Sequence, residues 1–286
     1  MAWEYADLFD AEMKPDQDDF LQWLTKDIPT AIRVGRMGYR TRTTVAGPRL
    51  EAEVYPIFGR EQEKRARAAK QMISPEKQRR LNYERSVRHL IQLVDANFTD
   101  QDIHLTLTYQ DAPDYKQCRK DIRNFMNRVK RIREKRKLPE LKYIYTIEGN
   151  DDGKRERIHV HLLMNSGIGR EELEQIWAKG YANADRLRPD ESGLEAISRY
   201  IVKQQKNKRK WCQSRNLKQP KSRTSDSKCS NARVKRIAYD FRNEAKEIME
   251  KLYPGYRYIK CSVFYSDVLD GVYIRCVMRK QEDGRG

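Results

Sequence analysis

Two histidines separated by one residue give the clearest chemical signal in this sequence. His159 and His161 lie in the apolar run from Ile158 to Met164, in a chain of 286 residues that contains four histidines. Side chains alternate between the two faces of a β-strand, so both imidazoles would project from one face while Val160 points into the core. Neutral imidazole is a common metal ligand. The pattern favours a metal site, and its alternative is a pair of exposed histidines on an antiparallel strand.

A carboxylate at the end of the preceding predicted strand is the third candidate ligand. Glu148 closes the run YIYTIE, which would pair antiparallel with the histidine strand. The long connecting loop leaves the register open. Asp151 and Asp152 therefore compete with Glu148, although a turn explains them equally well. Five cysteines without a Cys-x-x-Cys pair argue against a thiolate zinc site, so magnesium or manganese is the expected cofactor.

A tyrosine some forty residues further on is the candidate nucleophile. Tyr200 and Lys203 lie one helical turn apart in the run AISRYIVKQQK. A phenol hydroxyl beside an ammonium group could attack an electrophile with electrostatic help. Taken alone, such a tyrosine is more often a residue at the edge of a core. The pair gains meaning only beside the histidine strand.

The elements that must position these residues alternate between strand and helix. The run 103–109 alternates strictly, with Leu105 and Leu107 on one face and His104, Thr106 and Thr108 on the other. The polar face is expected to support the metal ligands or to contact DNA. Further strands are predicted at 142–148 and 157–164, and helices at 75–97, 114–137, 170–180 and from 194 onward. This order predicts an α+β fold of the split-βαβ or ferredoxin-like type, with helices packed on a central antiparallel sheet.

Three motifs together resemble those of the HUH endonucleases, in particular the rolling-circle replication initiators (Rep proteins) of bacterial plasmids and phages. They are LTLT at 105–108, His-Val-His at 159–161 and Tyr-Ile-Val-Lys at 200–203. Conjugative relaxases of this superfamily place the tyrosine before the histidine strand, which disfavours that class here. Ala196 and Gln204 occupy the positions of a second tyrosine, so the chain resembles the one-tyrosine enzymes. No GxxxxGK[ST] loop indicates a fused helicase.

The resemblance covers about residues 75–220 and implies a five-stranded sheet with the histidine strand in the centre. It implies nicking and joining of single-stranded or hairpin origin DNA, through a 5′-phosphotyrosine intermediate and a free 3′ hydroxyl. A divalent ion would be bound, and a host helicase and polymerase would be further partners. The alternatives are a relaxase or single-strand transposase with the same chemistry, and a nucleic-acid-binding protein without catalytic activity.

The charge of the chain favours a polyanionic partner. The sequence has 59 Lys and Arg against 42 Asp and Glu, a formal net charge of +17. Residues 203–223 contribute nine basic side chains and no acidic one. This segment is expected to follow a DNA strand, with Trp211 stacking on an unpaired base; a solvated charged run is the alternative. Its predicted DNA contacts, with the two threonines of the first strand, are Thr106, Thr108, Lys206, Lys208, Arg209, Lys210, Trp211, Arg215 and Lys218.

Three regions are expected along the chain. An acidic arm and a β-hairpin around Gly47-Pro48 occupy 1–74, the endonuclease core occupies 75–223, and 224–286 holds a helix from Val234 to Leu252 and a closing hairpin that packs on the core. No apolar run is long enough to cross a bilayer, and the first residues lack the features of a secretory signal. The sequence therefore predicts a cytoplasmic protein without membrane association.

Overall fold

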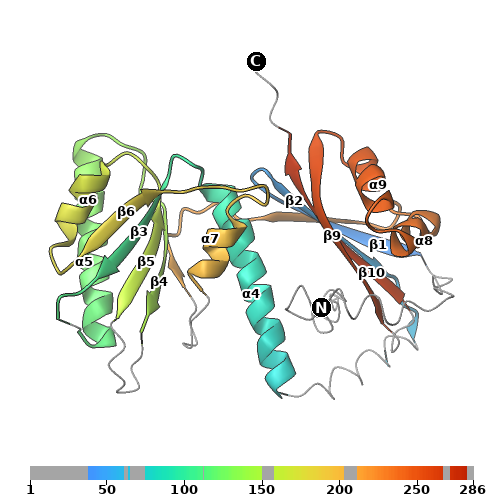
Figure 1. The fold of residues 1–286 in the computed structure, drawn as a ribbon, viewed down its shortest axis with the longest axis horizontal. Coiled ribbons are helices and arrows are strands. Elements are labelled where there is room, and N and C mark those ends of the chain that lie inside the picture. The colour runs from blue at the N-terminus through green and yellow to red at the C-terminus, as the bar shows by residue number, and fades with distance from the viewer. Residues whose placement is uncertain are drawn as a thin grey trace. The chain divides into compact units, whose positions relative to one another are not determined.

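The computed structural model describes residues 38–60, 64, 75–111, 113–149, 158–202, 211–266 and 271–281 (Figure 1). Its internal contacts divide the chain into two units. Leu93–Gln219 forms one, which we call the inserted unit, and Met1–Gln92 with Pro220–Gly286 forms the other, the terminal unit. The acidic arm expected at the N-terminus lies outside the described residues.

The inserted unit is built on a five-stranded antiparallel sheet, as expected for the α+β class. Its strands are β3 (Ile103–Thr108), β4 (Tyr143–Glu148), β5 (His159–Met164), β6 (Ala182–Arg186) and β7 (Cys212–Gln213). Their order is β6-β3-β5-β4-β7, so the histidine strand β5 is central. Strands β6 and β7 have no counterpart among the predicted elements. Both are short, and the Asn and Asp of β6 are residues that strands disfavour.

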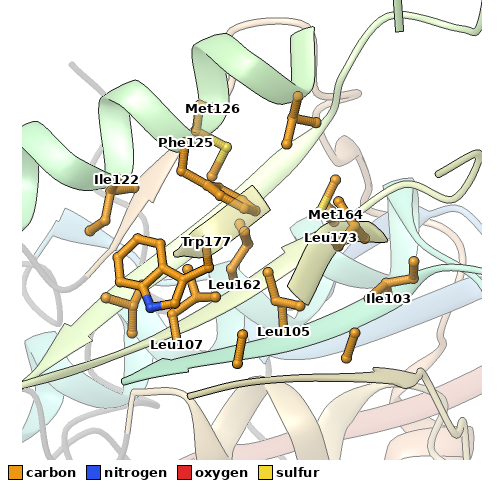
Figure 2. Close-up of a cluster of buried hydrophobic side chains, with 14 of the residues drawn as sticks. Ile103, Leu105, Leu107, Ile122, Phe125, Met126, Leu162, Met164, Leu173 and Trp177 are labelled. Carbon is orange, nitrogen blue, oxygen red and sulfur yellow. The ribbon is translucent and has the colours of Figure 1, made fainter. Parts of the chain in front are cut away.

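Two helices cover one face of this sheet and leave the other face to the histidines. They are α5 (Tyr115–Lys135) and α6 (Arg170–Trp177). Figure 2 shows side chains such as Phe125 and Trp177 packed on the apolar positions of β3 and β5. Leu105 and Leu107 are fully buried in this layer. Each such side chain stabilises the fold by about 1.5–3 kcal/mol through burial.

The turn after α6 holds the end of β3 in place. The helix ends at Trp177 because Ala178 adopts a left-handed conformation, with φ of 50°, earlier than the stop expected at Gly180. The Trp177 indole donates to the Thr108 carbonyl oxygen at 2.7 Å. A Cβ atom at Gly180 would lie 2.6 Å from the Gln110 nitrogen and 2.7 Å from the Thr108 oxygen. Glycine is therefore required where this loop meets the backbone of the first strand.

The terminal unit joins the two ends of the chain in a second five-stranded antiparallel sheet. The expected hairpin at Gly47-Pro48 is confirmed as β1 (Tyr39–Ala46) and β2 (Arg49–Pro56). The strands of the closing hairpin are confirmed as β9 (Tyr256–Ser266) and β10 (Gly271–Lys280), and β8 (Lys221–Ser225) adds one edge. The order is β8-β1-β2-β10-β9. The first and last predicted extensions therefore share one sheet.

The helices of the terminal unit differ from the prediction in one place. The single helix expected from Val234 to Leu252 is wrong, because the structure has α8 (Asn231–Tyr239) and α9 (Glu244–Leu252). The Asp240 carboxylate accepts hydrogen bonds from the Asn243 backbone at 3.2 Å and side chain at 2.9 Å, which forms a turn between them. The expected helix α4 (Pro75–Asn97) is confirmed. None of the helices in the described part of the chain is long and apolar enough to cross a membrane.

A buried charge network lies on the polar face of β2. Arg49 Nε and Glu51 Oε1 are 2.6 Å apart, and both side chains are at most 2% exposed. Gln92 donates to Glu51 at 2.9 Å, and Arg275 lies 3.3 Å from it. Burial alone would raise the pKa of Glu51, but the charges of the surrounding arginines, led by Arg275 and Arg49, lower it to about 2. The carboxylate therefore stays ionised inside the fold.

Candidate metal and nucleophile site

The polar face of the inserted sheet brings the candidate ligands into adjacent rows. Residues directly opposite each other in antiparallel strands share a face. Glu148 lies opposite His159, so both project from the same side of the sheet. His161 lies opposite Thr146 on one side and Thr106 on the other. The register that the sequence left open therefore places Glu148 on the histidine face.

Glu148, His159 and His161 converge on one point. Glu148 Oε2 accepts a hydrogen bond from His159 Nε2 at 2.8 Å and another from His161 Nε2 at 3.2 Å. One potential ligand atom from each residue lies within 4.8 Å of the others. His161 is 2% exposed, whereas His159 is 32% exposed in its side chain. The cluster is thus anchored in the sheet and open to solvent on one side.

The donor set of this cluster suits a divalent ion. Two imidazole nitrogens and one carboxylate oxygen supply neutral and anionic ligands, and no thiolate is among them. The buried hydroxyl of Thr146, opposite His161, has no hydrogen-bond partner among the described residues. This part of the face therefore retains hydrogen-bonding capacity for a water or phosphate oxygen. Asp151 and Asp152, the competing carboxylates, lie outside the described residues.

A third histidine supports the buried ligand from behind. His104 Nε2 lies 3.3 Å from His161 Nδ1, and the rings stack with centroids 5.5 Å apart and planes at 26°. Thr106 Oγ1 is 3.5 Å from the same nitrogen. An imidazole nitrogen donates or accepts according to its tautomer, so His104 can partner either form of His161. Such contacts orient a metal ligand through the nitrogen that does not bind the ion.

The electrostatics of the sheet keep both stacked imidazoles neutral. Burial lowers the pKa of His104 to about 4, the neighbouring His161 lowers it further, and Asp185 opposes this shift. Burial and then His159 lower the pKa of His161, while Glu148 opposes them. Neutral imidazole is the form that binds a metal. The environment thus prepares these rings for coordination near neutral pH.

Tyr200 lies against the histidines from a separate helix. It ends α7 (Glu195–Tyr200), and its ring is 57% exposed. The Tyr200 and His161 ring centroids are 5.0 Å apart with planes at 69°, and the His104 centroid is 6.3 Å from that of Tyr200. The structure therefore brings together the predicted nucleophile and the predicted ligands. The exposed ring leaves its hydroxyl accessible to a large substrate.

The helix that carries Tyr200 is short and is held by contacts at its start. Asp95 accepts a hydrogen bond from the Leu194 backbone at 3.0 Å. Ser198 Oγ donates to the Leu194 carbonyl oxygen at 2.7 Å and is fully buried. Ile201 and Val202 are buried directly after the tyrosine. These anchors on both sides fix the position of Tyr200 on the sheet.

The structure places the remaining predicted DNA contacts in different settings. Lys203, Lys206, Lys208, Arg209 and Lys210 lie outside the described residues, so their roles stay predictions. Thr108 donates its hydroxyl to the Tyr181 carbonyl oxygen at 2.9 Å, which ties β3 to the approach to β6. Arg215 and Lys218 are exposed. The Lys218 backbone is held by Asn97, which accepts from its nitrogen at 2.7 Å.

Trp211 lies on the same face as the histidines. Its indole donates to Gln213 Oε1 at 2.8 Å, so the two side chains lie on one side of β7. Gln213 is opposite Ile144, which shares its face of β4 with Thr146 and Glu148 because the side chains alternate. The half-buried indole therefore lies at the β7 edge of the face that holds Glu148 and the histidines.

Two polar residues of β6 complete this face and were not predicted from the sequence. Asn183 lies opposite Thr106, and Asp185 lies opposite His104. Asn183 Nδ2 donates to Asp185 Oδ2 at 2.8 Å. The alternation of Ala182 and Ala184 with these polar residues was the available signal, but five residues of low strand propensity gave it little weight.

The comparisons with known proteins identify the same part of the chain. Neither the search of curated proteins nor that of solved structures gave a match. The scan against family models gave one, which begins just before β3 and ends after α7 and so includes Glu148, His161 and Tyr200. Residues 102–205 match the family described as replication-associated protein ORF2, which is consistent with a replication initiator of the Rep type.

Proposed function

We propose that the inserted unit is a metal-dependent endonuclease and ligase that nicks one DNA strand and rejoins it, and that it thereby initiates rolling-circle replication. The observation that carries this proposal is the contact of Tyr200 with His161, whose other ring nitrogen faces Glu148. An exposed phenol beside a cluster of two imidazoles and a carboxylate combines a nucleophile with ligands for a Lewis acid. The family match supports the role in replication.

Glu148, His159 and His161 would hold the divalent ion, with magnesium or manganese as the expected choice. When bound, the ion would supply Lewis-acid stabilisation of the charge that develops on the phosphate oxygens. His104 and Thr106 would keep the His161 ring in the orientation that presents Nε2 to the site. The residues of the sheet thus position the ligands before any substrate arrives.

The chemical step assigned to Tyr200 is a transesterification at phosphorus. The phenol oxygen forms a bond to phosphorus, the bond from phosphorus to the ribose 3′ oxygen breaks, the phenol proton is lost and the 3′ oxygen gains a proton. The products are a 5′-phosphotyrosine and a free 3′ hydroxyl. Because the covalent link retains the energy of the phosphodiester, attack by a 3′ hydroxyl on the adduct reverses the step and joins two ends. Lys203 is proposed to assist phenolate formation, from its sequence position alone.

A single unpaired strand is the proposed substrate. The Tyr200 ring is exposed beside the metal cluster, and Trp211 offers an indole at the edge of the same face. Stacking on an aromatic ring requires a base that is not paired in a duplex. The alternatives with the same chemistry are a relaxase and a single-strand transposase, and the class without chemistry is a nucleic-acid-binding protein.

The experiment that tests the proposal is adduct capture from a randomised library of labelled single-stranded oligonucleotides with manganese. The full chain should form a protein–DNA adduct that resists denaturation, and peptide mapping should place the DNA on Tyr200. Sequencing of the captured strands then gives the recognised site. Tyr200→Phe and chelator should each abolish the adduct. An adduct on Tyr200→Phe would show another nucleophile, and binding without any adduct would favour the non-catalytic interpretation.

A further inference from the structure

The terminal unit carries a basic surface that the proposed chemistry does not use. Residues 220–236 contain six basic side chains and one acidic residue, Asp226, which is paired with Arg40 at 2.7 Å. Arg236 pairs with Glu244, and within the described residues the other five cations form no ion pair. Four of these five form what we call the β8–α8 surface: Lys221, Arg223, Lys228 and Arg233.

A chain of contacts joins these four residues on one side of the sheet. Arg223 lies opposite Thr43, whose hydroxyl is 2.6 Å from the hydroxyl of Tyr253. The Lys228 ammonium lies over the Tyr253 ring, 4.6 Å from its centroid. Arg233 in turn donates to the Lys228 carbonyl oxygen at 3.2 Å.

Lys221 extends the surface along the edge strand. It precedes Arg223 by two positions and so shares its face of β8. Lys221, Arg223 and Arg233 are exposed, and β8 forms one edge of its sheet. The surface is therefore continuous and accessible within the terminal unit (Figure 1 shows β1 and α8).

The composition of this surface fits the phosphate backbone of a nucleic acid. Unpaired cations release counterions when they contact phosphates. The exposed hydroxyls of Thr224 and Ser227 alternate with the cations and are further hydrogen-bond donors to phosphate oxygens. The ring inside the surface, Tyr253, is only 8% exposed and is covered by Lys228, so it cannot stack on a base. These features suit backbone contacts with a duplex better than capture of an unpaired strand.

We infer that the β8–α8 surface binds the backbone of double-stranded DNA, independently of the metal cluster and of Tyr200. This contact would hold paired DNA through the terminal unit, whereas the proposed chemistry acts on an unpaired strand in the inserted unit. It carries no sequence information, because cations and hydroxyls on phosphates do not contact base edges.

The test measures duplex binding by full-length Tyr200→Phe in chelator, which removes the proposed chemistry. The variant combines Lys221→Gln, Arg223→Gln, Lys228→Gln and Arg233→Gln, and the probe is a labelled duplex of arbitrary sequence at several salt concentrations. Affinity should fall about tenfold or more at low salt, and the slope of log K against log salt should decrease by about 0.9 for each phosphate that the variant no longer neutralises. The decrease should be the same for unrelated duplex sequences.

A matched control removes the same charge from other exposed cations of the terminal unit. Arg242→Gln, Lys246→Gln, Arg257→Gln and Lys280→Gln change residues that are all exposed, two of them on the strands at the far end of the sheet order from β8. This control should retain most of the affinity and the salt slope. An equal decrease in the control, no decrease in the β8–α8 variant, or a decrease confined to single strands, to vesicles of anionic lipid or to an acidic protein would overturn the inference.

Failure of this inference and failure of the proposed function give different results. With Tyr200 intact, the β8–α8 variant should still form the manganese-dependent adduct with a short single strand. If it loses that adduct while its unfolding transition is unchanged, the surface belongs to the catalytic unit's substrate path and the independent role is wrong. If no protein forms an adduct, the duplex assay still decides the role of the surface.

Discussion

The rings of Tyr200 and His161 meet at 5.0 Å between centroids, with planes at 69°, although they come from a short helix and from the central strand of the sheet. The imidazole that faces the tyrosine also faces the carboxylate of Glu148 at 3.2 Å. The nucleophile and the metal cluster therefore share one side chain. This arrangement makes their contributions separable by mutation.

Tyr200→Phe should abolish the covalent adduct and leave metal binding intact. The phenylalanine ring keeps the contact with His161 but lacks the oxygen that attacks phosphorus. Manganese affinity, measured by calorimetry or by electron paramagnetic resonance, should stay within about twofold of the original, since the three ligands are unchanged. A large drop in manganese binding would show that the tyrosine is part of the ion site.

Glu148→Ala should weaken manganese binding by about tenfold or more, because it removes the anionic ligand on which both imidazoles converge. Glu140→Ala is the control, since Glu140 is an exposed carboxylate of the same unit. Calorimetric titration of both variants gives the comparison. Unchanged affinity in Glu148→Ala would remove this residue from the ligand set.

His104 is expected to act as a positioning residue. His104→Phe keeps a ring against Tyr200 but cannot hydrogen bond to His161, so manganese affinity should fall about 10- to 100-fold. His104→Gln, which restores a hydrogen-bonding group near the Nε2 position, should recover part of that affinity. Equal affinities for the two variants would show that the contact with the His161 nitrogen has no such role.

Trp211→Ala should weaken single-strand binding by about 5- to 150-fold, the effect of removing about 1–3 kcal/mol of stacking on one base. Trp211→Phe should retain much of the affinity. Fluorescence anisotropy with a short single strand measures the change, and Tyr239→Ala removes another exposed ring, 51% exposed on α8, as a control. A similar decrease on duplex DNA would contradict a stacking role.

Glu51→Gln tests the buried charge network. Removing the carboxylate leaves Arg49 buried without its partner, which should cost about 3–5 kcal/mol of unfolding free energy near neutral pH. The pKa of Glu51 is lowered to about 2 from 4.5, so its stabilising contribution is complete above 4.5 and is lost as the pH falls towards 2. The gap between the original protein and the variant, measured by chemical denaturation, should therefore narrow in acid.

The control for that measurement is Glu247→Gln. Glu247 forms an exposed pair with Lys251 one helical turn away, and such pairs contribute little. This variant should unfold like the original protein at each pH. A pH-independent difference for Glu51→Gln would show that the network is not ionised as described.

The sequence predicted those features of the site that depend on local alternation. The period of two along β5 placed His159 and His161 on one face, and the same period placed His104 and Thr106 on the polar face of β3. The register of Glu148 could not be predicted, because it depends on how the loop between β4 and β5 closes. The contact of Tyr200 with His161 could not be predicted either, since it depends on tertiary packing of α7.

The second sheet was not predicted because its strand pairs are remote in sequence. Thr41 pairs with Ser225, and Val54 pairs with Ile274. Periodicity recognises each strand but contains no information about its distant partner. The basic segment shows the same limit, since Lys221 and Arg223 pair with β1 of the terminal unit rather than following the inserted unit.

The division of the chain has a consequence for its order of folding during synthesis. The terminal unit consists of Met1–Gln92 and Pro220–Gly286, so β1 and β2 emerge from the ribosome long before β8, β9 and β10 exist to pair with them. The inserted unit is complete once residue 219 is made. Contacts between distant segments form slowly because the intervening loop must first close. The catalytic half is therefore ready to fold co-translationally, while the nascent β1–β2 hairpin waits with an unpaired edge.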